Sequence, residues 1–423
     1  MPDEVCACRV RAPLKERSRP VASGLLRAAF SFTPAHRTGR RREHVVARRN
    51  PTSVKETKTY RAAIVGCGRK ASTIDDERRW LTNYDALPCS HASAYSSHPR
   101  TIIEAAADPD EAKRLAFGER WKVAKLYSDY RQMLAEVKPE IVSVTTHAHL
   151  HAQVTIDAAR AGAKGIICEK AMATSLQEAD EMIEACRSSG ARLLINHPRR
   201  YHSTYSAARK AIEAGEVGEL RAIVGMMFNA LIHNGTHLFD MFRFFAGEAR
   251  WVSAQVILGE SRQTAGGQAR QTAGGQASDP GGAGAVGFDS GVIALAEIST
   301  MQGFELQLLG SNGRIVINSF AEGFQVWRCE REAPQQGRQW FQYGPMKLAQ
   351  IETRQNHQPA KPPMLAAVED LVESIETGRE PVSSGEEGRA AFEIALACRM
   401  SSASGGKRVD IPFADRNFRV VSR

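Results

Sequence analysis

The residues best suited to chemistry follow short apolar runs that are expected to be buried strands. Gly66 and Gly68 come directly after the run 61–65, and Ala71 stands three residues further on. Glycines in a strand-to-helix turn let the backbone approach a pyrophosphate, and the start of the next helix offers N–H groups and a positive dipole. The alternative is an ordinary glycine turn. The candidate dinucleotide-binding residues here are Gly66, Cys67, Gly68, Arg69 and Lys70.

A second candidate is Asp108, which ends the predicted strand 101–107 and precedes Pro109. An acid at this place accepts hydrogen bonds from both ribose hydroxyls and repels a 2′-phosphate, so it favours NAD over NADP. Asp108 lies further from the glycines than the usual ~20 residues, which makes 72–99 an enlarged connection, part loop and part helix. The alternative for Asp108 is a helix cap.

Charged side chains also follow two later strands. Glu169 and Lys170 come after the predicted strand 165–168, at the carboxyl edge where parallel sheets bind ligands. A lysine there can hydrogen-bond a substrate hydroxyl and help to deprotonate it, whereas the alternative is an exposed charge pair. Arg199, Arg200 and Tyr201 follow the strand 192–196 and are candidates for substrate or cofactor contact, with inter-domain salt bridges as the alternative.

Histidines raise the question of a metal. Two groups have spacings that can bind zinc: His147, His149 and His151, and His233 with His237. No glutamate follows His233, and Gly235 is expected to interrupt any helix that would join the second pair. We therefore expect no metal site. The cysteines form no C-x-x-C pair, and their dispersal favours a reducing compartment, the cytoplasm.

The elements that must position these residues alternate between strand and helix over 59–197. Helices are predicted at 128–137, 150–161 and 175–189, between strands at 61–65, 101–107, 141–146, 165–168 and 192–196. This order is typical of a Rossmann domain with a doubly wound parallel sheet.

The pattern changes over 198–423. One helix, 204–214, is followed by strand-like segments without intervening helices, which predicts an α+β domain with a mostly antiparallel open sheet. Those segments are 220–228, 251–258, 291–298, 303–309 and 313–318. Helices at 364–377 and 386–402 close the chain, where they are free to pack back on the first domain. The repeat of 262–269 in 270–277 is expected to be a loop without chemistry.

Charge is concentrated in the first 58 residues. This segment holds eleven Arg and three Lys against five acidic residues, which accounts for the whole net charge of +9. We expect a disordered basic extension over 1–58 and a neutral body with no affinity for nucleic acid. No apolar run is long enough to span a bilayer, so no membrane partner is expected.

The order of the motifs resembles a known family, the Gfo/Idh/MocA oxidoreductases, over about residues 60–415. Besides the glycine turn and Glu169-Lys170, the resemblance rests on Asp108-Pro109-Asp110, Thr146 with His151, 196–201 (NHPRRY), 215–218 (GEVG) and 233–240 (HNGTHLFD). It implies hydride transfer between NAD(P) and a secondary alcohol or ketone of a sugar, cyclitol or related polyol, in a homodimer or homotetramer.

The resemblance also implies roles for single residues. Lys170 would be catalytic, with Ala171 in place of the family's proline. His237 would be the second catalytic group, while His233 stands where the family has an aspartate. Further implied cofactor contacts are Thr146, His147, His151, Glu169 and Lys170, and implied substrate contacts are Arg200, Tyr201, His233, Asn234 and His237. Two alternatives remain open: a redox-neutral sugar-modifying enzyme with bound NAD, and a non-catalytic sensor on the same fold.

Overall fold

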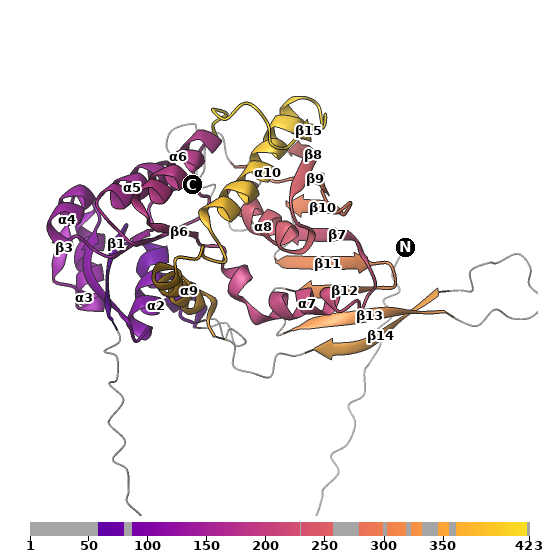
Figure 1. The fold of residues 1–423 in the computed structure, drawn as a ribbon, viewed down its shortest axis with the longest axis horizontal. Helices are drawn as coiled ribbons and strands as arrows, with labels where there is room; N and C mark the ends of the chain where they lie inside the picture. Colours follow the sequence, from indigo (N-terminus) through magenta and orange to yellow (C-terminus); the bar gives the residue numbers. More distant parts are fainter. Residues whose placement is uncertain are drawn as a thin grey trace, which may run out of the picture. The chain divides into compact units, whose positions relative to one another are not determined.

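The computed structural model describes residues 58–79, 87–228, 230–256, 279–298, 303–318, 323–331, 346–354 and 361–420. The predictions for the basic extension, apart from Lys58, and for the repeat 262–277 lie outside these residues. The described chain builds two sheets with helices around them (Figure 1).

The first sheet is parallel and has six strands in the order β3-β2-β1-β4-β5-β6. Its strands are β1 (Tyr60–Val65), β2 (Thr101–Ala107), β3 (Lys125–Tyr127), β4 (Ile141–Val144), β5 (Gly165–Cys168) and β6 (Arg192–Ile195). Every residue of β4 and β5 is buried, as expected for strands covered on both faces. The predicted doubly wound parallel sheet is confirmed, and β3 is an additional edge strand.

Helices connect these strands. They are the π-turn η1 (Arg69–Thr73), α1 (Ile74–Arg78), α2 (His91–Ser97), α3 (Glu111–Trp121), α4 (Tyr130–Val137), α5 (Ala148–Arg160) and α6 (Leu176–Ser189). Asp110, and not Asp108, caps α3, because its side chain accepts a hydrogen bond from the Lys113 N–H. This removes the helix-cap alternative for Asp108.

The second sheet has nine strands in the order β14-β13-β12-β11-β7-β10-β9-β8-β15. All neighbours pair antiparallel except β7 and β10, which confirms the mostly antiparallel prediction. The strands are β7 (Leu220–Met227), β8 (Ala249–Val256), β9 (Gly282–Phe288), β10 (Ile293–Ile298), β11 (Phe304–Gly310), β12 (Gly313–Asn318), β13 (Phe324–Arg331), β14 (Met346–Arg354) and β15 (Val409–Asp410).

The helices of this part include one that the sequence analysis missed. They are η2 (Pro198–Tyr201), α7 (Ser203–Glu213), α8 (Gly235–Ala246), α9 (Pro363–Thr377) and α10 (Gly385–Ala403). Gly235 is the first residue of α8, so no helix joins His233 to His237, as expected. A Cβ at this position would lie 2.9 Å from Ile298 Cδ1, so close packing against β10 favours glycine here.

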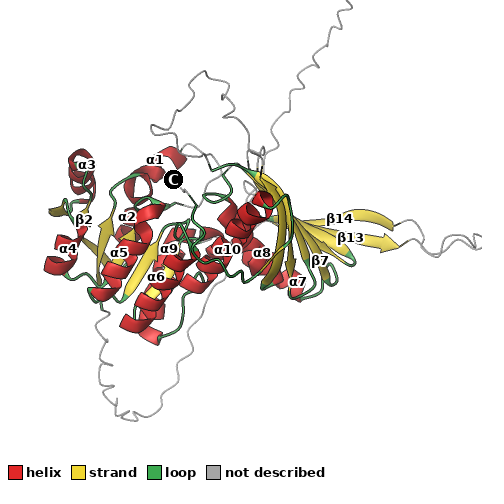
Figure 2. Ribbon diagram, turned by 90° about the horizontal axis from the view of Figure 1, so that it is seen from above, coloured by secondary structure: helices red, strands yellow, loops and turns green. Residues whose placement is uncertain are grey.

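Helices cover one face of the second sheet. Helix α8 packs on β7 and β10, α10 on β8, and α7 on β12, and Figure 2 shows these helices on the same side. On β10, Ile293 and Leu295 point to the other face and are 45% and 49% exposed. The final helices also reach the first sheet, since α9 packs on β5 and β6 and α10 on β6. The boundary between the Rossmann domain and the α+β domain at residue 197 stays a prediction.

Candidate active site

The glycine turn after β1 fits a dinucleotide. Gly66 has φ +94°, and a Cβ there would lie 2.9 Å from the Thr145 carbonyl carbon, so the position requires glycine on both counts. A Cβ on Gly68 would meet nothing within 4 Å, so the backbone at this point faces open space. The turn thus presents bare main chain beside the ends of β1 and β4, as a pyrophosphate site needs.

Asp108 lies against the same turn. One carboxylate oxygen accepts the Cys67 N–H at 2.7 Å, and the other accepts the Asp110 N–H at 2.9 Å. Two carboxylate oxygens can accept about four hydrogen bonds, so capacity for ribose hydroxyls remains. The Cys67 thiol is inert at neutral pH, because burial raises its pKa to about 12. Cys67 therefore acts here through its backbone.

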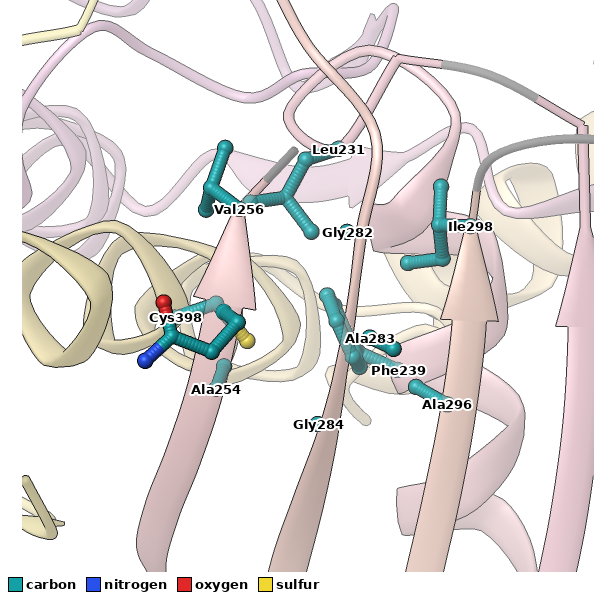
Figure 3. A pocket seen from close by; sticks show the side chains of 11 residues that line it. Leu231, Phe239, Ala254, Val256, Gly282, Ala283, Gly284, Ala296, Ile298 and Cys398 are labelled. Atoms are coloured by element: carbon teal, nitrogen blue, oxygen red, sulfur yellow. The ribbon is translucent and has the colours of Figure 1, made fainter. Parts of the chain in front are cut away.

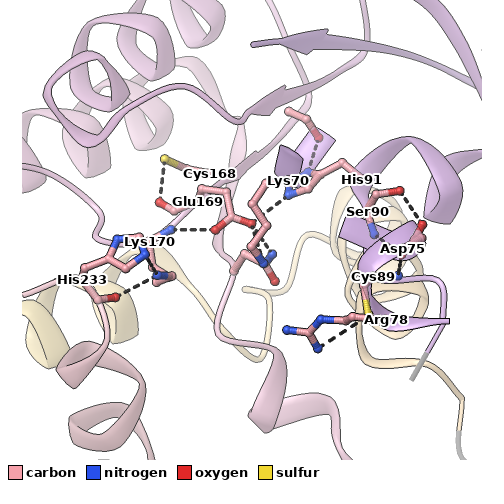
Figure 4. Close-up of polar contacts among 12 residues, drawn as sticks. Lys70, Asp75, Arg78, Cys89, Ser90, His91, Cys168, Glu169, Lys170 and His233 are labelled. Atoms are coloured by element: carbon pink, nitrogen blue, oxygen red, sulfur yellow. Dashed lines mark hydrogen bonds and ion pairs between the residues drawn. The ribbon is translucent and has the colours of Figure 1, made fainter. Parts of the chain in front are cut away.

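The other two turn residues point to different acids. The Arg69 side chain is paired with Glu77, at 2.6 Å from Nε to Oε1. Lys70 instead reaches Glu169, with 3.6 Å between Nζ and Oε1 (Figure 4). The glycine turn and the Glu169-Lys170 dipeptide are thus in direct contact through Lys70.

Lys170 is buried, with 7% of its surface exposed, and its amine contacts His233 (Figure 4). Its Nζ lies 3.0 Å from His233 Nε2 and donates to the His233 carbonyl oxygen at 2.8 Å. Burial lowers the pKa of Lys170 to about 7, against the opposing effect of Glu169. The amine is therefore able to exchange a proton near neutral pH. The Lys170–Ala171 peptide is cis.

Glu169 is a buried carboxylate, and three polar side chains surround its Oε1. Its Oε1 accepts from Asn196 Nδ2 at 2.8 Å and lies 3.2 Å from His91 Nε2, in addition to Lys70. Burial alone would raise its pKa, but Lys70 and His91 hold the pKa well below its usual value. Glu169 is therefore ionised.

His91 was not singled out by the sequence analysis. It begins α2 inside the enlarged connection and is fully buried. Its Nδ1 lies 2.8 Å from Ser143 Oγ, which in turn lies 2.8 Å from the Tyr95 hydroxyl. Buried Asp75 fixes the start of α2, since it accepts hydrogen bonds from Ser90 and from the Cys89 N–H. A histidine within a connection gave no signal of this contact, because the contact depends on the fold.

His237 lies in the first turn of α8 and packs edge-on against His197, with 5.5 Å between ring centroids. Its pKa is held well below the usual value by burial and then by the charges of Lys170 and Arg199, so the ring is neutral. The residue in hydrogen-bond contact with Lys170 is His233, and the charge of Lys170 also acts on His237.

His151 has a different role from the one expected. Its ring is buried, with Nδ1 2.9 Å from the Ala171 carbonyl and Nε2 3.0 Å from the Thr146 carbonyl. Both nitrogens face backbone carbonyls, so His151 ties the loops after β4 and β5 together and has no ring nitrogen left for a cofactor. Thr146 and His147 open α5, and the exposed His147 ring stacks on His149. Among the described residues, no group of three or more His, Cys, Asp or Glu is arranged to hold a metal.

Arg200 and Tyr201, which were expected to contact substrate, bind other side chains of the protein. The Arg200 guanidinium is buried and donates to Asp240 at 2.7 Å and Glu387 at 2.6 Å. The Tyr201 hydroxyl donates to Asp370 at 2.7 Å. Both side chains join η2 to α8, α9 and α10, so the salt-bridge alternative is the right one for Arg200. Asn234 precedes α8, and its carbonyl accepts the His237 N–H at 3.0 Å.

A separate apolar pocket lies between the second sheet and its helices (Figure 3). Leu231, Phe239 and Ile298 contribute to its wall, together with small residues of β8 and β9. Its one ionisable group is the Cys398 thiol, whose pKa burial raises to about 12. The pocket therefore lacks the groups for proton transfer, and the chemistry belongs to the Lys170 site. In the part of the chain described, no helix has the length and apolarity needed to cross a bilayer.

The fold and this site define a class: a nicotinamide-dependent dehydrogenase with a Rossmann domain and a second, mostly antiparallel domain. The chain belongs to the Gfo/Idh/MocA oxidoreductase family. Residues 86–197 match its "NAD-binding Rossmann fold" description, and residues 210–411 match its "C-terminal alpha/beta domain" description.

Individual relatives carry names of dehydrogenases. Myo-inositol 2-dehydrogenase of Thermotoga maritima is 22% identical over 336 residues, covering 74% of this chain and 92% of the relative. Levoglucosan dehydrogenase of Pseudarthrobacter phenanthrenivorans is 28% identical over 193 residues, covering 40% and 48% of the two chains. A solved structure, levoglucosan dehydrogenase with NADH and levoglucosan, has a TM-score of 0.64 at 19% identity, covering 84% of this chain and 100% of the other. At that identity the likeness shows the fold.

Proposed function

We propose that the protein transfers hydride between NAD and a secondary alcohol or ketone of a sugar, cyclitol or related polyol. The observation that carries this is a buried amine, Lys170, whose pKa is lowered to about 7 and which lies one residue from an acid that contacts the glycine turn. Similar proteins are named for inositol, levoglucosan and D-apiose, which supports polyol substrates.

NAD, when bound, supplies the hydride acceptor, and the protein supplies the proton acceptor and the alignment. For oxidation, the neutral Nζ of Lys170 takes the hydroxyl proton. The His233 carbonyl and ring, at 2.8 and 3.0 Å, hold this amine in place. In this proposal the neutral His237 ring hydrogen-bonds the same hydroxyl and orients it.

The test is a screen of sugars, sugar acids and inositols with NAD and with NADP, which follows the absorbance of the reduced cofactor. Net NADH formation with at least one polyol supports the proposal. Product formation without net NADH would instead indicate a redox-neutral enzyme. Binding without any turnover would indicate a sensor.

Cofactor preference is expected to depend on Asp108. NAD should bind more tightly than NADP, because the carboxylate beside the turn repels a 2′-phosphate. Asp108→Ser should weaken NAD binding and reduce the difference in affinity between NAD and NADP, as measured by calorimetry. Asp110→Ser is the matched control, since serine still caps α3 and the preference should stay unchanged. Equal or tighter binding of NADP to the unmodified protein would contradict this.

We also propose that the bare face of the second sheet joins copies of the chain into a homodimer or homotetramer. Exposed apolar side chains on a sheet face favour burial in an interface. Leu295→Arg is expected to give monomers in light scattering at micromolar concentration, while Leu115→Arg, at an exposed site on α3, should leave the mass unchanged. A monomeric unmodified chain would refute the proposal.

The cytoplasmic location stays a proposal. It rests on the dispersed cysteines, of which Cys67, Cys89, Cys168, Cys186, Cys329 and Cys398 are free thiols in the described residues.

A further inference from the structure

Arg199 is a guanidinium whose charge the described chain leaves unpaired. It belongs to η2 and lies over the ring of Phe304, with 3.9 Å between Cζ and the ring centroid. Phe304 is 2% exposed, so the guanidinium is stacked on a fixed, buried surface. Among the described residues, no carboxylate oxygen lies within 4 Å of the Arg199 guanidinium or of Lys170 Nζ, in contrast to the Arg200 guanidinium.

The backbone brings Arg199 and Lys170 to the same end of both sheets. Strands β5 and β6 are neighbours with Cys168 opposite Ile195, so the segments that follow them leave the sheet side by side. Phe304 begins β11 opposite Met227, the last residue of β7, and the chain then runs to His233, which holds Lys170. The charge of Arg199 also lowers the pKa of Lys170 and that of His237, after the larger effect of burial on each.

The acids near Lys170 and His237 already have partners. Glu169 is bound by Lys70 and Asn196. The Asp279 carboxylate accepts the backbone N–H groups of Ile232 and His233, at 2.7 to 3.1 Å. Asp240 is bound by Arg200. A guanidinium without a carboxylate partner therefore lies near a site whose own carboxylates are engaged.

We propose that Arg199 binds an anionic group of the substrate, a carboxylate or a phosphate, so that the enzyme acts on sugar acids or sugar phosphates in preference to neutral sugars. This rests on the proposed function and names its substrate class. Arginine suits the task because its planar fork matches both anions, and stacking on Phe304 fixes the plane of that fork.

The test measures binding, so that it does not depend on turnover. The full chain, saturated with NAD, is titrated by calorimetry with D-gluconate, D-glucose 6-phosphate, D-glucose and myo-inositol. At least one anion is expected to bind tighter than both neutral compounds by about 10- to 100-fold, the range of a charge-assisted hydrogen bond. D-Gluconate tests for binding of a carboxylate, and D-glucose 6-phosphate tests for binding of a phosphate.

Arg199→Met should remove this advantage and leave the affinities for the neutral compounds within about twofold. Arg199→Lys keeps the positive charge but lacks the planar guanidinium. Its affinity for anions should lie between that of the unmodified chain and that of Arg199→Met. The matched control is Arg209→Met, because Arg209 also stacks on an aromatic ring, that of Phe244, but is paired with Glu213. This control should bind like the unmodified chain.

Two results would overturn the inference: neutral compounds that bind as tightly as the anions, or anion binding that survives Arg199→Met. Anions could bind through Arg199 while no compound, in this set of four or in the wider screen, yields NADH. In that case the inference about Arg199 holds and the proposed dehydrogenase activity fails. If only neutral compounds are oxidised, the activity holds and the inference fails.

Discussion

Lys170→Met is expected to lower kcat for oxidation by about 10²–10⁴-fold, the usual loss when a general base is removed. Methionine keeps an unbranched side chain of similar length, so the burial at this position is retained while the amine is lost. NAD affinity, measured by calorimetry, should change little, because the contacts of the glycine turn remain. A variant that keeps more than about a tenth of the kcat would contradict the role of Lys170.

The same amine sets the expected pH dependence. Lys170 accepts a proton only in its neutral form, which predominates above its pKa of about 7. The kcat for oxidation should therefore rise as the pH increases through about 7 and then level off. His233→Asp places a carboxylate beside the amine, favours the charged form, and should move the inflection to higher pH. A rate that is flat between pH 6 and pH 9 would contradict this assignment.

His237→Asn is the second change with a large expected effect. The neutral ring lies in the first turn of α8, where the charge of Lys170 helps to lower its pKa. Loss of the ring should lower kcat by about 10²–10⁴-fold. NAD affinity should be nearly unchanged, since His237 comes from outside the glycine turn. The measurement is steady-state kinetics on a substrate from the screen, paired with NAD calorimetry.

His149→Asn is a suitable control for this substitution. His149 is exposed at the start of α5 and should tolerate the change with a kcat within about twofold of the unmodified protein. Comparable losses for His149→Asn and His237→Asn would show that the effect is not specific to the site.

The first sheet could be predicted because its strands are continuous apolar runs, and because the residues after them are those that ligands need. The glycine turn, Asp108, Glu169 and Lys170 all follow strand ends, where chain order alone fixes the place of a side chain. The short edge strand β3 carries only three residues, too few for a pattern.

Contacts between distant segments could not be predicted. Helix α8 was missed, and the close packing of its first residue, Gly235, on Ile298 appears only when α8 lies against β10. Arg200 had the right type and place for a ligand, yet Asp240 and Glu387 reach it from α8 and α10. His91 could not be found for the same reason, since its partners Ser143 and Glu169 come from other strands.

The buried contacts of His91 determine where a proton can travel. Because Glu169 is ionised, His91 Nε2 carries the hydrogen that lies toward it, and Nδ1 of the same ring lies 2.8 Å from Ser143 Oγ. Ser143 Oγ also lies 2.8 Å from the Tyr95 hydroxyl. This row of polar contacts runs from Glu169 to Tyr95, which is fully buried, so it ends in the core. The row therefore does not lead a proton from Glu169 to solvent through the core, whereas His233, which contacts Lys170, is partly exposed.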